Sequence, residues 1–416
     1  MKGKYSIVIL ALVALVAGFS SCGEDRWAAY YPQTSHALWI DSIMRENYLW
    51  NDELADEDDL TSSYFLDAVS FLNKVKYTDD KVSYIDTACS VPVVDYGYEL
   101  MMSQVNDTAY MAVITYLEPN SVAALAGLQR GEWIMGVDGA FITSSTQELL
   151  ADGEAHQLTV GKYATITAPG ENDDEEVEQE VIVYDREVSL PAASGYQHED
   201  LPVVSVIDDH IGYMLYNDIA AENQSKVASA SQTYAQAAIT DLVLDLRYAT
   251  TGDLGGMQYL ASVLAPASTL GTTLAQVQYA ESRHLENTLS LLGADQLENG
   301  MNLDLNNLYV ITTSSTTGMA EILINCLKGV MNVVIVGQQT KGATAVACET
   351  YRDPSHDQQL RLAVCQVSDI NGSTDYLGTG FTPDYEVNPF SSVGAILPFG
   401  NPEEAMLATA LAAMNQ

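Results

Sequence analysis

The chain has 416 residues, with 17 Lys and Arg against 56 Asp and Glu, so its formal net charge at pH 7 is -39. Such a surplus of negative charge repels phosphate backbones and anionic membrane surfaces, and we exclude nucleic-acid binding on this ground. Hydrophobic residues make up 47% of the sequence, which is a globular composition, and the length allows two or three domains. We interpret the acidic residues as a solvated surface.

The N-terminus has the layout of an export signal. Lys2 and Lys4 precede the apolar run "YSIVILALVALVAGF", and small residues lead to Cys22. This pattern predicts a secretory signal peptide over residues 1–21. The stretch "FSSC" resembles a bacterial lipobox, which implies a lipidated Cys22 and a chain anchored in the cell envelope, on the periplasmic or surface face of the outer membrane. No other stretch reaches about 18 continuous apolar residues, so we expect no further membrane segment.

The other cysteines do not form a disulfide framework. Cys89 and Cys326 are expected to be buried free thiols, whereas Cys348 and Cys365 fall on predicted neighbouring strands, which leaves a bridge between them open. The spacing of the cysteines fits no zinc site and the six histidines are scattered. We therefore predict no metal and no cofactor.

Three segments differ in their apolar periodicity. Residues 27–76 predict helices, the second of them capped at Thr61 or Ser62. Short alternating strands follow, and further on strands and helices alternate, which is typical of a parallel or mixed sheet covered by helices. The prediction is a multidomain α/β protein, with a helical N-terminal region at 22–90, a β domain at 91–187 and an α/β core at 188–416.

The β domain contains a recognisable motif. In "LEPNSVAALAGLQRGEWIMGVDGAFI", residues 117–142, Ser121 can cap a short helix and Gly131 can turn the chain into a strand. This motif resembles a PDZ domain, and the upstream "YGYEL" is similar to the carboxylate-binding loop of that family. The resemblance implies that backbone amides hold a peptide C-terminus while the peptide adds a strand to an open edge. The implied peptide-binding residues are Gly97, Tyr98, Glu99 and Leu100.

Three further motifs follow the PDZ-like stretch in a set order. They are "LVLDLRY" at 242–248, "LYVITTSSTTGMAEILINCLKG" at 308–329 with "VVIVGQQTKGA" at 333–343, and "GTGFTPDYEV" at 378–387. The order resembles the tail-specific, or C-terminal processing, serine peptidases. That resemblance implies an α/β core of the ClpP/crotonase type that carries a serine/lysine dyad.

The dyad residues of that family are absent from the matching positions. The nucleophile motif, Leu-Thr-Ser-x-x-Thr-Ala-Ser-Ala-Ser-Glu, places Gly318 at the serine and Met319 after it. The motif Thr-x-Gly-Lys aligns with "TKGA" and places Ala343 at the general base. Lys341 stands two residues earlier, about 6 to 7 Å away along a predicted strand. That is farther than the roughly 3 Å that proton transfer needs.

The turn that supplies part of the oxyanion hole also departs from the family. Where Asp-Leu-Arg-x-Asn-x-Gly-Gly is usual, Ala249 replaces the asparagine and Thr250 and Thr251 follow it. β-Branched residues resist the backbone angles that glycine allows, so we expect a different turn, with Thr250 and Met319 at the oxyanion-equivalent positions. These losses predict a pseudopeptidase that binds peptides or protein C-termini without cleaving them.

Two alternatives stay open from the sequence. In one, the chain is an active serine-type endopeptidase with a rearranged dyad, in which Lys341 is the base and the nucleophile is Ser314, Ser315, Thr316 or Thr317. In the other, it is a structural envelope protein with a closed PDZ groove. Threonines near a helix start commonly satisfy backbone amides without any chemistry, which favours the non-cleaving interpretation. The sequence specifies neither the partner nor the oligomeric state.

Overall fold

The computed structural model describes residues 27–87, 93–169, 176–305, 307–353, 355–390 and 396–415. The predicted signal peptide, the predicted lipidation site Cys22 and Cys89 lie outside these residues. The chain divides into two compact units, residues 1–88 with 351–362 and residues 89–350 with 363–416. Within the described ranges, no helix combines the length and apolar character that crossing a membrane requires.

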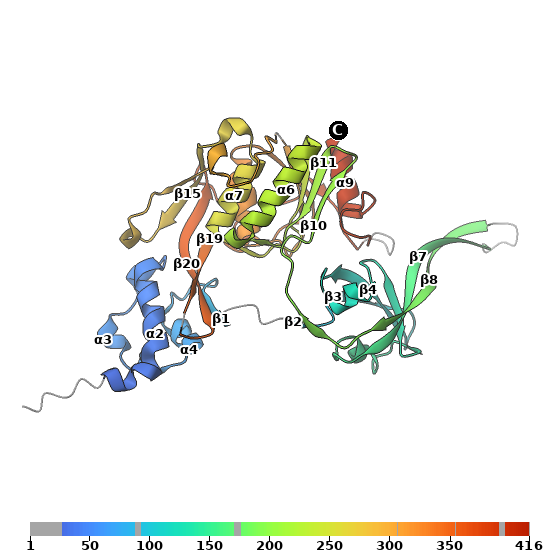
Figure 1. Cartoon of the computed structure of the whole chain (residues 1–416), viewed down its shortest axis with the longest axis horizontal. Helices are drawn as coiled ribbons and strands as arrows, with labels where there is room; N and C mark the ends of the chain where they lie inside the picture. Colours follow the sequence, from blue (N-terminus) through green and yellow to red (C-terminus); the bar gives the residue numbers. More distant parts are fainter. Residues whose placement is uncertain are drawn as a thin grey trace, which may run out of the picture. The chain divides into compact units, whose positions relative to one another are not determined.

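The first unit is built from helices closed by a strand pair. It contains α2 (Trp27–Asn47), α3 (Glu57–Leu60) and α4 (Ala68–Val75), and β1 (Tyr84–Thr87) pairs antiparallel with the start of β20 (Gln358–Asp369) (Figure 1). The predicted helical N-terminal region is confirmed. A segment from late in the sequence therefore completes the N-terminal unit.

The predicted start of the second helix is wrong. α4 is capped by Asp67, whose carboxylate accepts a hydrogen bond of 2.9 Å from the Ser70 amide. Neither Thr61 nor Ser62 caps it, because a separate 3₁₀ turn occupies residues 63–65. An aspartate three residues before a free amide is as good a cap as serine or threonine, so the sequence offered competing start points.

The β-rich part of the second unit forms one sheet. Its main strands follow the order β3-β4-β5-β7-β8, and β6 pairs with β5. Figure 1 shows β7 and β8 as a long twisted hairpin. The predicted short helix forms as α5 (Val122–Leu125), with the Ser121 side chain accepting a hydrogen bond from the Ala124 amide. The strands are β3 (Tyr98–Gln104), β4 (Tyr110–Leu117), β5 (Trp133–Val137), β6 (Ala140–Phe141), β7 (His156–Pro169) and β8 (Glu176–Leu190).

The α/β core contains a mixed six-stranded sheet in the order β10-β11-β13-β17-β18-β21, as the sequence predicted. β10 is antiparallel to β11 and the remaining pairs are parallel. Most residues of the central strands are buried because helices cover both faces, which explains their nearly continuous apolar sequences. The strands are β10 (Val203–Ile207), β11 (Ile211–Leu215), β13 (Asp241–Asp245), β17 (Asn307–Thr312), β18 (Asn332–Gly337) and β21 (Tyr385–Glu386).

Four long helices accompany this sheet. They are α6 (Gln224–Ala237), α7 (Leu254–Leu264), α8 (Met319–Lys328) and α9 (Ala405–Met414). Figure 1 shows α6 and α7 on one side of β10 and β11, and α9 on the other side. α6 is fixed to the sheet by Tyr234, whose hydroxyl donates to the Tyr213 carbonyl at 2.6 Å.

A buried ion cluster joins α9 to the end of β13. The Arg247 guanidinium bonds to Asp245 at 2.7 Å and to Glu404 at 2.9 Å, and all three side chains are at most 2% exposed. Glu404 also caps α9 by accepting hydrogen bonds from the Met406 and Leu407 amides. The cluster holds the backbone just after β13, where the loops of the candidate site begin.

A second sheet carries the cysteines that could have paired. β15 (Thr273–Tyr279) lies between β16 (Thr288–Ser290) and β20, and β19 (Val346–Arg352) pairs with β20. Cys348 lies on β19 and Cys365 on β20; both are buried and no disulfide joins them, and Cys326 is also a buried thiol. Burial raises the pKa of the Cys365 thiol to about 12, so it is protonated and unreactive at neutral pH.

Candidate functional site

The loops that follow three parallel strands form the candidate site. β13, β17 and β18 are neighbours in the sheet, and their carboxyl ends lead into residues 246–253, 313–318 and 338–345. In open α/β sheets, reactive groups gather where such strands end. All the dyad-equivalent and oxyanion-equivalent positions predicted from the sequence lie in these loops or in the first turn of α8.

The loop after β17 uses its hydroxyl groups to hold the backbone. Thr316 is fully buried, and its hydroxyl donates to the Leu246 carbonyl at 2.9 Å and accepts from the Thr313 amide at 2.9 Å. The Thr313 hydroxyl in turn donates to the Arg247 carbonyl at 2.6 Å. Thr316, one of the alternative nucleophiles, therefore has both its proton and its acceptor position occupied. Ser314 and Ser315 are exposed.

Gly318, at the position equivalent to the nucleophile, is the N-cap of α8 and has φ 62 and ψ -125. Residues with side chains rarely adopt this conformation. A Cβ atom at this position would lie only 2.6 Å from the Thr250 carbonyl oxygen. A serine here would therefore need both a different backbone conformation and a displaced neighbouring loop.

The turn after β13 places a carbonyl oxygen, a hydrogen-bond acceptor, where stabilisation of an oxyanion would need N–H donors. Thr251 and Gly252 form β14, which pairs parallel with β12 (Asp218–Ile219), and Gly252 has φ 146. A Cβ atom at Gly252 would lie 2.8 Å from the Cβ of Met319, so the turn packs directly on the start of α8. An oxyanion is stabilised by N–H donors aimed at it, whereas here the carbonyl of Thr250 points at Gly318.

Glu321 fixes the loop that carries the base-equivalent position. Its carboxylate is fully buried and accepts hydrogen bonds from the Thr340 hydroxyl at 2.5 Å, the Gly342 amide at 2.6 Å and the Ala343 amide at 3.2 Å. The Thr317 hydroxyl lies 3.3 Å from the same carboxylate. The Glu321 carboxylate thereby links the start of α8 to the loop that carries Ala343.

The sequence prediction that Lys341 lies on a strand is wrong. Residues 338–345 form a loop, and β19 begins only at Val346. Gly342 has φ 69, a left-handed conformation that does not occur in an extended strand, so the spacing estimated for a strand does not apply. Both Lys341 and Ala343 are exposed, and the Lys341 amide donates to the Thr316 carbonyl at 3.1 Å.

The predicted peptide-binding loop lies at the start of β3, an edge strand of the β-rich sheet. Its Gly97 amide donates to the Asp95 carboxylate at 2.6 Å, and the Tyr196 hydroxyl donates to the same oxygen at 2.8 Å. The Tyr98 hydroxyl donates to the Leu150 carbonyl at 2.8 Å. The Asp95 carboxylate thus already accepts the hydrogen bond of the Gly97 amide, one of the donors that a peptide carboxylate would need. Glu99 is exposed and Leu100 half-buried, with an irregularity in the strand pairing between them.

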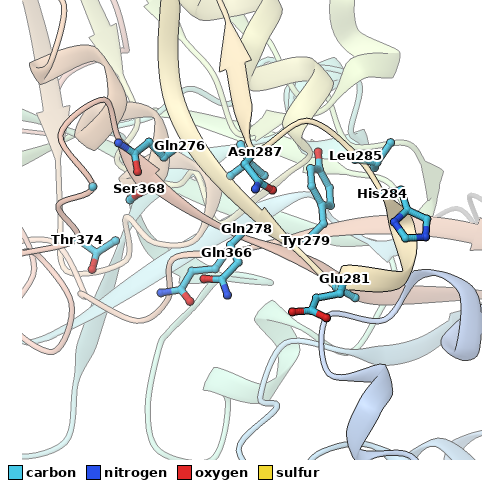
Figure 2. A pocket seen from close by; sticks show the side chains of 13 residues that line it. Gln276, Gln278, Tyr279, Glu281, His284, Leu285, Asn287, Gln366, Ser368 and Thr374 are labelled. Carbon is cyan, nitrogen blue, oxygen red and sulfur yellow. The ribbon is translucent and has the colours of Figure 1, made fainter.

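A large polar cavity lies elsewhere in the second unit. It has a volume of about 710 Å3 and lies along β15, β20 and the loop after β15. Figure 2 shows the amide side chains of Gln278 and Gln366 next to each other. Gln276 and Asn287 also line the cavity. None of the dyad-equivalent positions lines it. The sequence offered no signal for this cavity, because its walls come from segments far apart in the chain.

Within the described residues, one group of three side chains could hold a metal ion, namely His36, Asp353 and His356 in the first unit. The predicted dyad-equivalent, oxyanion-equivalent and peptide-binding residues lie in the second unit.

Comparison with known proteins places this arrangement in a family. The family described as Peptidase family S41 matches residues 210–387, and the Peptidase S41 N-terminal domain matches residues 36–84. A crystal structure of a presumed S41 protease from Bacteroides fragilis NCTC 9343 is 34% identical, with 91% of this chain and 97% of that chain covered and a TM-score of 0.76. The chain belongs to peptidase family S41.

The structure is similar to those of S41 proteases, as a multidomain α/β protein with N-terminal helices and mixed sheets. The photosystem II D1 C-terminal processing protease is 16% identical, with 86% of this chain and 94% of that chain covered and a TM-score of 0.46. The resemblance to tail-specific peptidases is confirmed at the level of family S41. Membership of a family does not establish activity, which depends on the groups in the site.

Proposed function

We propose that this S41 homologue is a lipid-anchored envelope protein that binds peptides or protein C-termini without cleaving them. The proposal includes export, anchoring through Cys22, a PDZ-like β-rich domain and a ClpP/crotonase-like core. One observation carries it above the others. At the nucleophile-equivalent position, Gly318 has a positive φ and the Thr250 carbonyl oxygen lies 2.6 Å from where a Cβ atom would be.

The chemistry of acyl transfer supports the proposal at each step. A nucleophile must attack the peptide carbonyl, a base must take its proton and N–H donors must stabilise the oxyanion. Gly318 offers no hydroxyl, Ala343 offers no amine and the Thr250 carbonyl is an acceptor. The neighbouring Thr316 hydroxyl is already bonded on both sides. No observation favours the rearranged dyad over these structural roles.

The edge strand β3 is the surface that supports peptide binding. Among the described residues its one neighbour in the sheet is β4, so an extended peptide can add a strand along its other edge. The chain's net charge of -39 favours peptides with basic side chains. Because Asp95 occupies the Gly97 amide, recognition along the strand edge is expected to contribute more than recognition of a terminal carboxylate.

A cleavage assay tests the absence of catalysis. The purified chain and its Lys341→Ala variant are incubated with a fluorescently labelled unfolded protein, and we expect no turnover by either. Hydrolysis by the wild type that disappears in Lys341→Ala contradicts the proposal. It then supports the rearranged dyad if alanine at Ser314, Ser315, Thr316 or Thr317 also abolishes cleavage.

A binding assay tests the other half of the proposal. Extended peptides with apolar C-termini and basic residues are measured by fluorescence anisotropy, each as the free acid and as the C-terminal amide. We expect micromolar affinity, about -8 kcal/mol, with little difference between the two forms. A strong preference for the free acid identifies C-termini as the ligand. Failure of every peptide to bind supports the structural alternative with a closed groove.

A further inference from the structure

Two histidines and an aspartate converge in the first unit. His36 lies on α2, whereas Asp353 and His356 lie between β19 and β20. The His36 Nε2 atom is 3.8 Å from Asp353 Oδ2, and the His356 Nδ1 atom is 2.6 Å from the same oxygen. One potential ligand atom from each residue lies within 4.8 Å of the other two. In the described part of the chain, this is the one group of at least three such side chains.

One atom of the group is left without a partner. The His36 Nε2 atom is buried and makes no hydrogen bond within the described residues. Buried polar atoms in proteins almost always have a partner, so an orphaned ring nitrogen that faces a carboxylate needs an explanation. A cation between the nitrogen and the Asp353 carboxylate would satisfy both.

Hydrogen bonds orient the Asp353 carboxylate. The Ser355 amide donates to its Oδ1 atom at 2.8 Å, and the His356 Nδ1 atom lies 2.6 Å from its Oδ2 atom. These contacts hold the carboxylate in place within the group.

The two histidine rings are stacked. The His36 and His356 rings are 4.2 Å apart between centroids and nearly parallel, at 6°. Because the nitrogen lone pairs lie in the ring planes, one ion can bind both rings only if at least one ring turns out of the stack.

We propose that His36, Asp353 and His356 form a binding site for a divalent transition metal, with Zn²⁺ as the ion that fits best. Two imidazole nitrogens and a carboxylate oxygen make a donor set that Zn²⁺ accepts, with a fourth position open to water. Mg²⁺ and Ca²⁺ prefer all-oxygen sites, and two imidazoles select against them. The site ties α2 to the segment between β19 and β20, and so joins the two parts of the sequence that build the first unit.

Besides a turn of the stacked rings, the two separations to the Asp353 oxygen must change for the ion to bind. With metal–ligand distances of about 2.0 Å, ligand atoms in a tetrahedral site are about 3.3 Å apart. The 3.8 Å separation must shorten and the 2.6 Å separation must lengthen, each by less than about 1 Å. The hydrogen bond between His356 and Asp353 is replaced by bonds from both residues to the metal.

Zinc titration of the whole purified chain tests the proposal. The chain is freed of metal by chelation and titrated with ZnCl₂ in excess Mg²⁺, which occupies the acidic surface. Isothermal calorimetry measures the stoichiometry, and we expect one tight Zn²⁺ per wild-type chain. The variants His36→Gln and Asp353→Asn, which nearly preserve shape, are expected to lose that equivalent. The matched control His210→Ala, at an exposed histidine of the second unit, is expected to keep it.

Two further readouts separate a metal site from a hydrogen-bonded cluster. Zn²⁺ is expected to raise the unfolding temperature of the wild type and of His210→Ala, because it binds the folded state, and to leave His36→Gln and Asp353→Asn unchanged. Co²⁺ is expected to give visible absorption bands in the wild type that are lost in His36→Gln. Equal Zn²⁺ stoichiometry in all four proteins, or no tight binding by any, overturns the proposal.

Discussion

Replacement of Gly318 by alanine measures directly whether the nucleophile-equivalent position can accept a side chain. The backbone conformation, φ 62 and ψ -125, costs a non-glycine residue about 1–3 kcal/mol. The overlap with the Thr250 carbonyl oxygen, 2.6 Å from the new Cβ atom, adds about 1–3 kcal/mol of overpacking. The two terms together predict a loss of about 2–6 kcal/mol in the free energy of unfolding. Each kcal/mol lowers the unfolding temperature of a unit of this size by roughly 1–2 °C.

Two glycines provide matched controls in the same unit, all measured by differential scanning calorimetry. Gly378 has φ 78 and no atom within 4 Å of its hypothetical Cβ, so Gly378→Ala bears the backbone cost alone, about 1–2 kcal/mol. Gly255, in the first turn of α7, has no positive φ and would make only ordinary contacts at 3.4 Å. Gly255→Ala is expected to change stability by less than about 1 kcal/mol. If Gly318→Ala is no more destabilising than Gly378→Ala, the steric argument is refuted.

The same reasoning predicts the behaviour of a restored dyad. A Gly318→Ser, Ala343→Lys double variant is expected to remain inactive on an unfolded protein substrate, because the Thr250 carbonyl occupies the space that the serine needs. Activity therefore requires the turn to change as well, through Thr251→Gly. Turnover by the double variant alone would show that the turn moves easily and that the dyad was the only loss.

Three further perturbations test other parts of the structure. Glu321→Gln places an amide donor against the loop amides, so we expect a loss of about 1–3 kcal/mol and faster hydrogen exchange at Gly342; unchanged exchange would contradict this. Burial raises the pKa of Glu404, but the Arg247 guanidinium lowers it by more, so the pKa lies below the ordinary value of about 4.3. The stability that this carboxylate contributes is therefore present at neutral pH and is lost as the pH falls through the acidic range. Calorimetry should show a steeper loss of unfolding temperature below about pH 5 in wild type than in Glu404→Gln, and parallel profiles would argue against the buried pair. Asp95→Ala frees an amide of the predicted peptide-binding loop and should raise affinity for free-acid peptides over amidated ones; an unchanged ratio would show that the amide takes no part.

Local patterns were sufficient for the order of elements and for the alignment of the site. The apolar strands before residues 246, 313 and 338 and the amphipathic helix after Gly318 follow from periodicity over single segments. The Ser121 cap was predictable because capping depends on residues three positions apart. The cap of α4 was not, since Asp67 competes with Thr61 and Ser62 and only packing chooses between them.

The sequence alone determined that serine and lysine are missing from the two dyad-equivalent positions, because motif spacing places Gly318 and Ala343 there. Only the tertiary structure decided which groups from other parts of the chain lie next to these two positions. The Thr250 carbonyl faces Gly318, and the Glu321 carboxylate holds the loop of Lys341 and Ala343 away from strand geometry. His36 meets Asp353 and His356 for the same reason. Such contacts join residues that are distant in sequence, and their geometry depends on packing that no local pattern encodes.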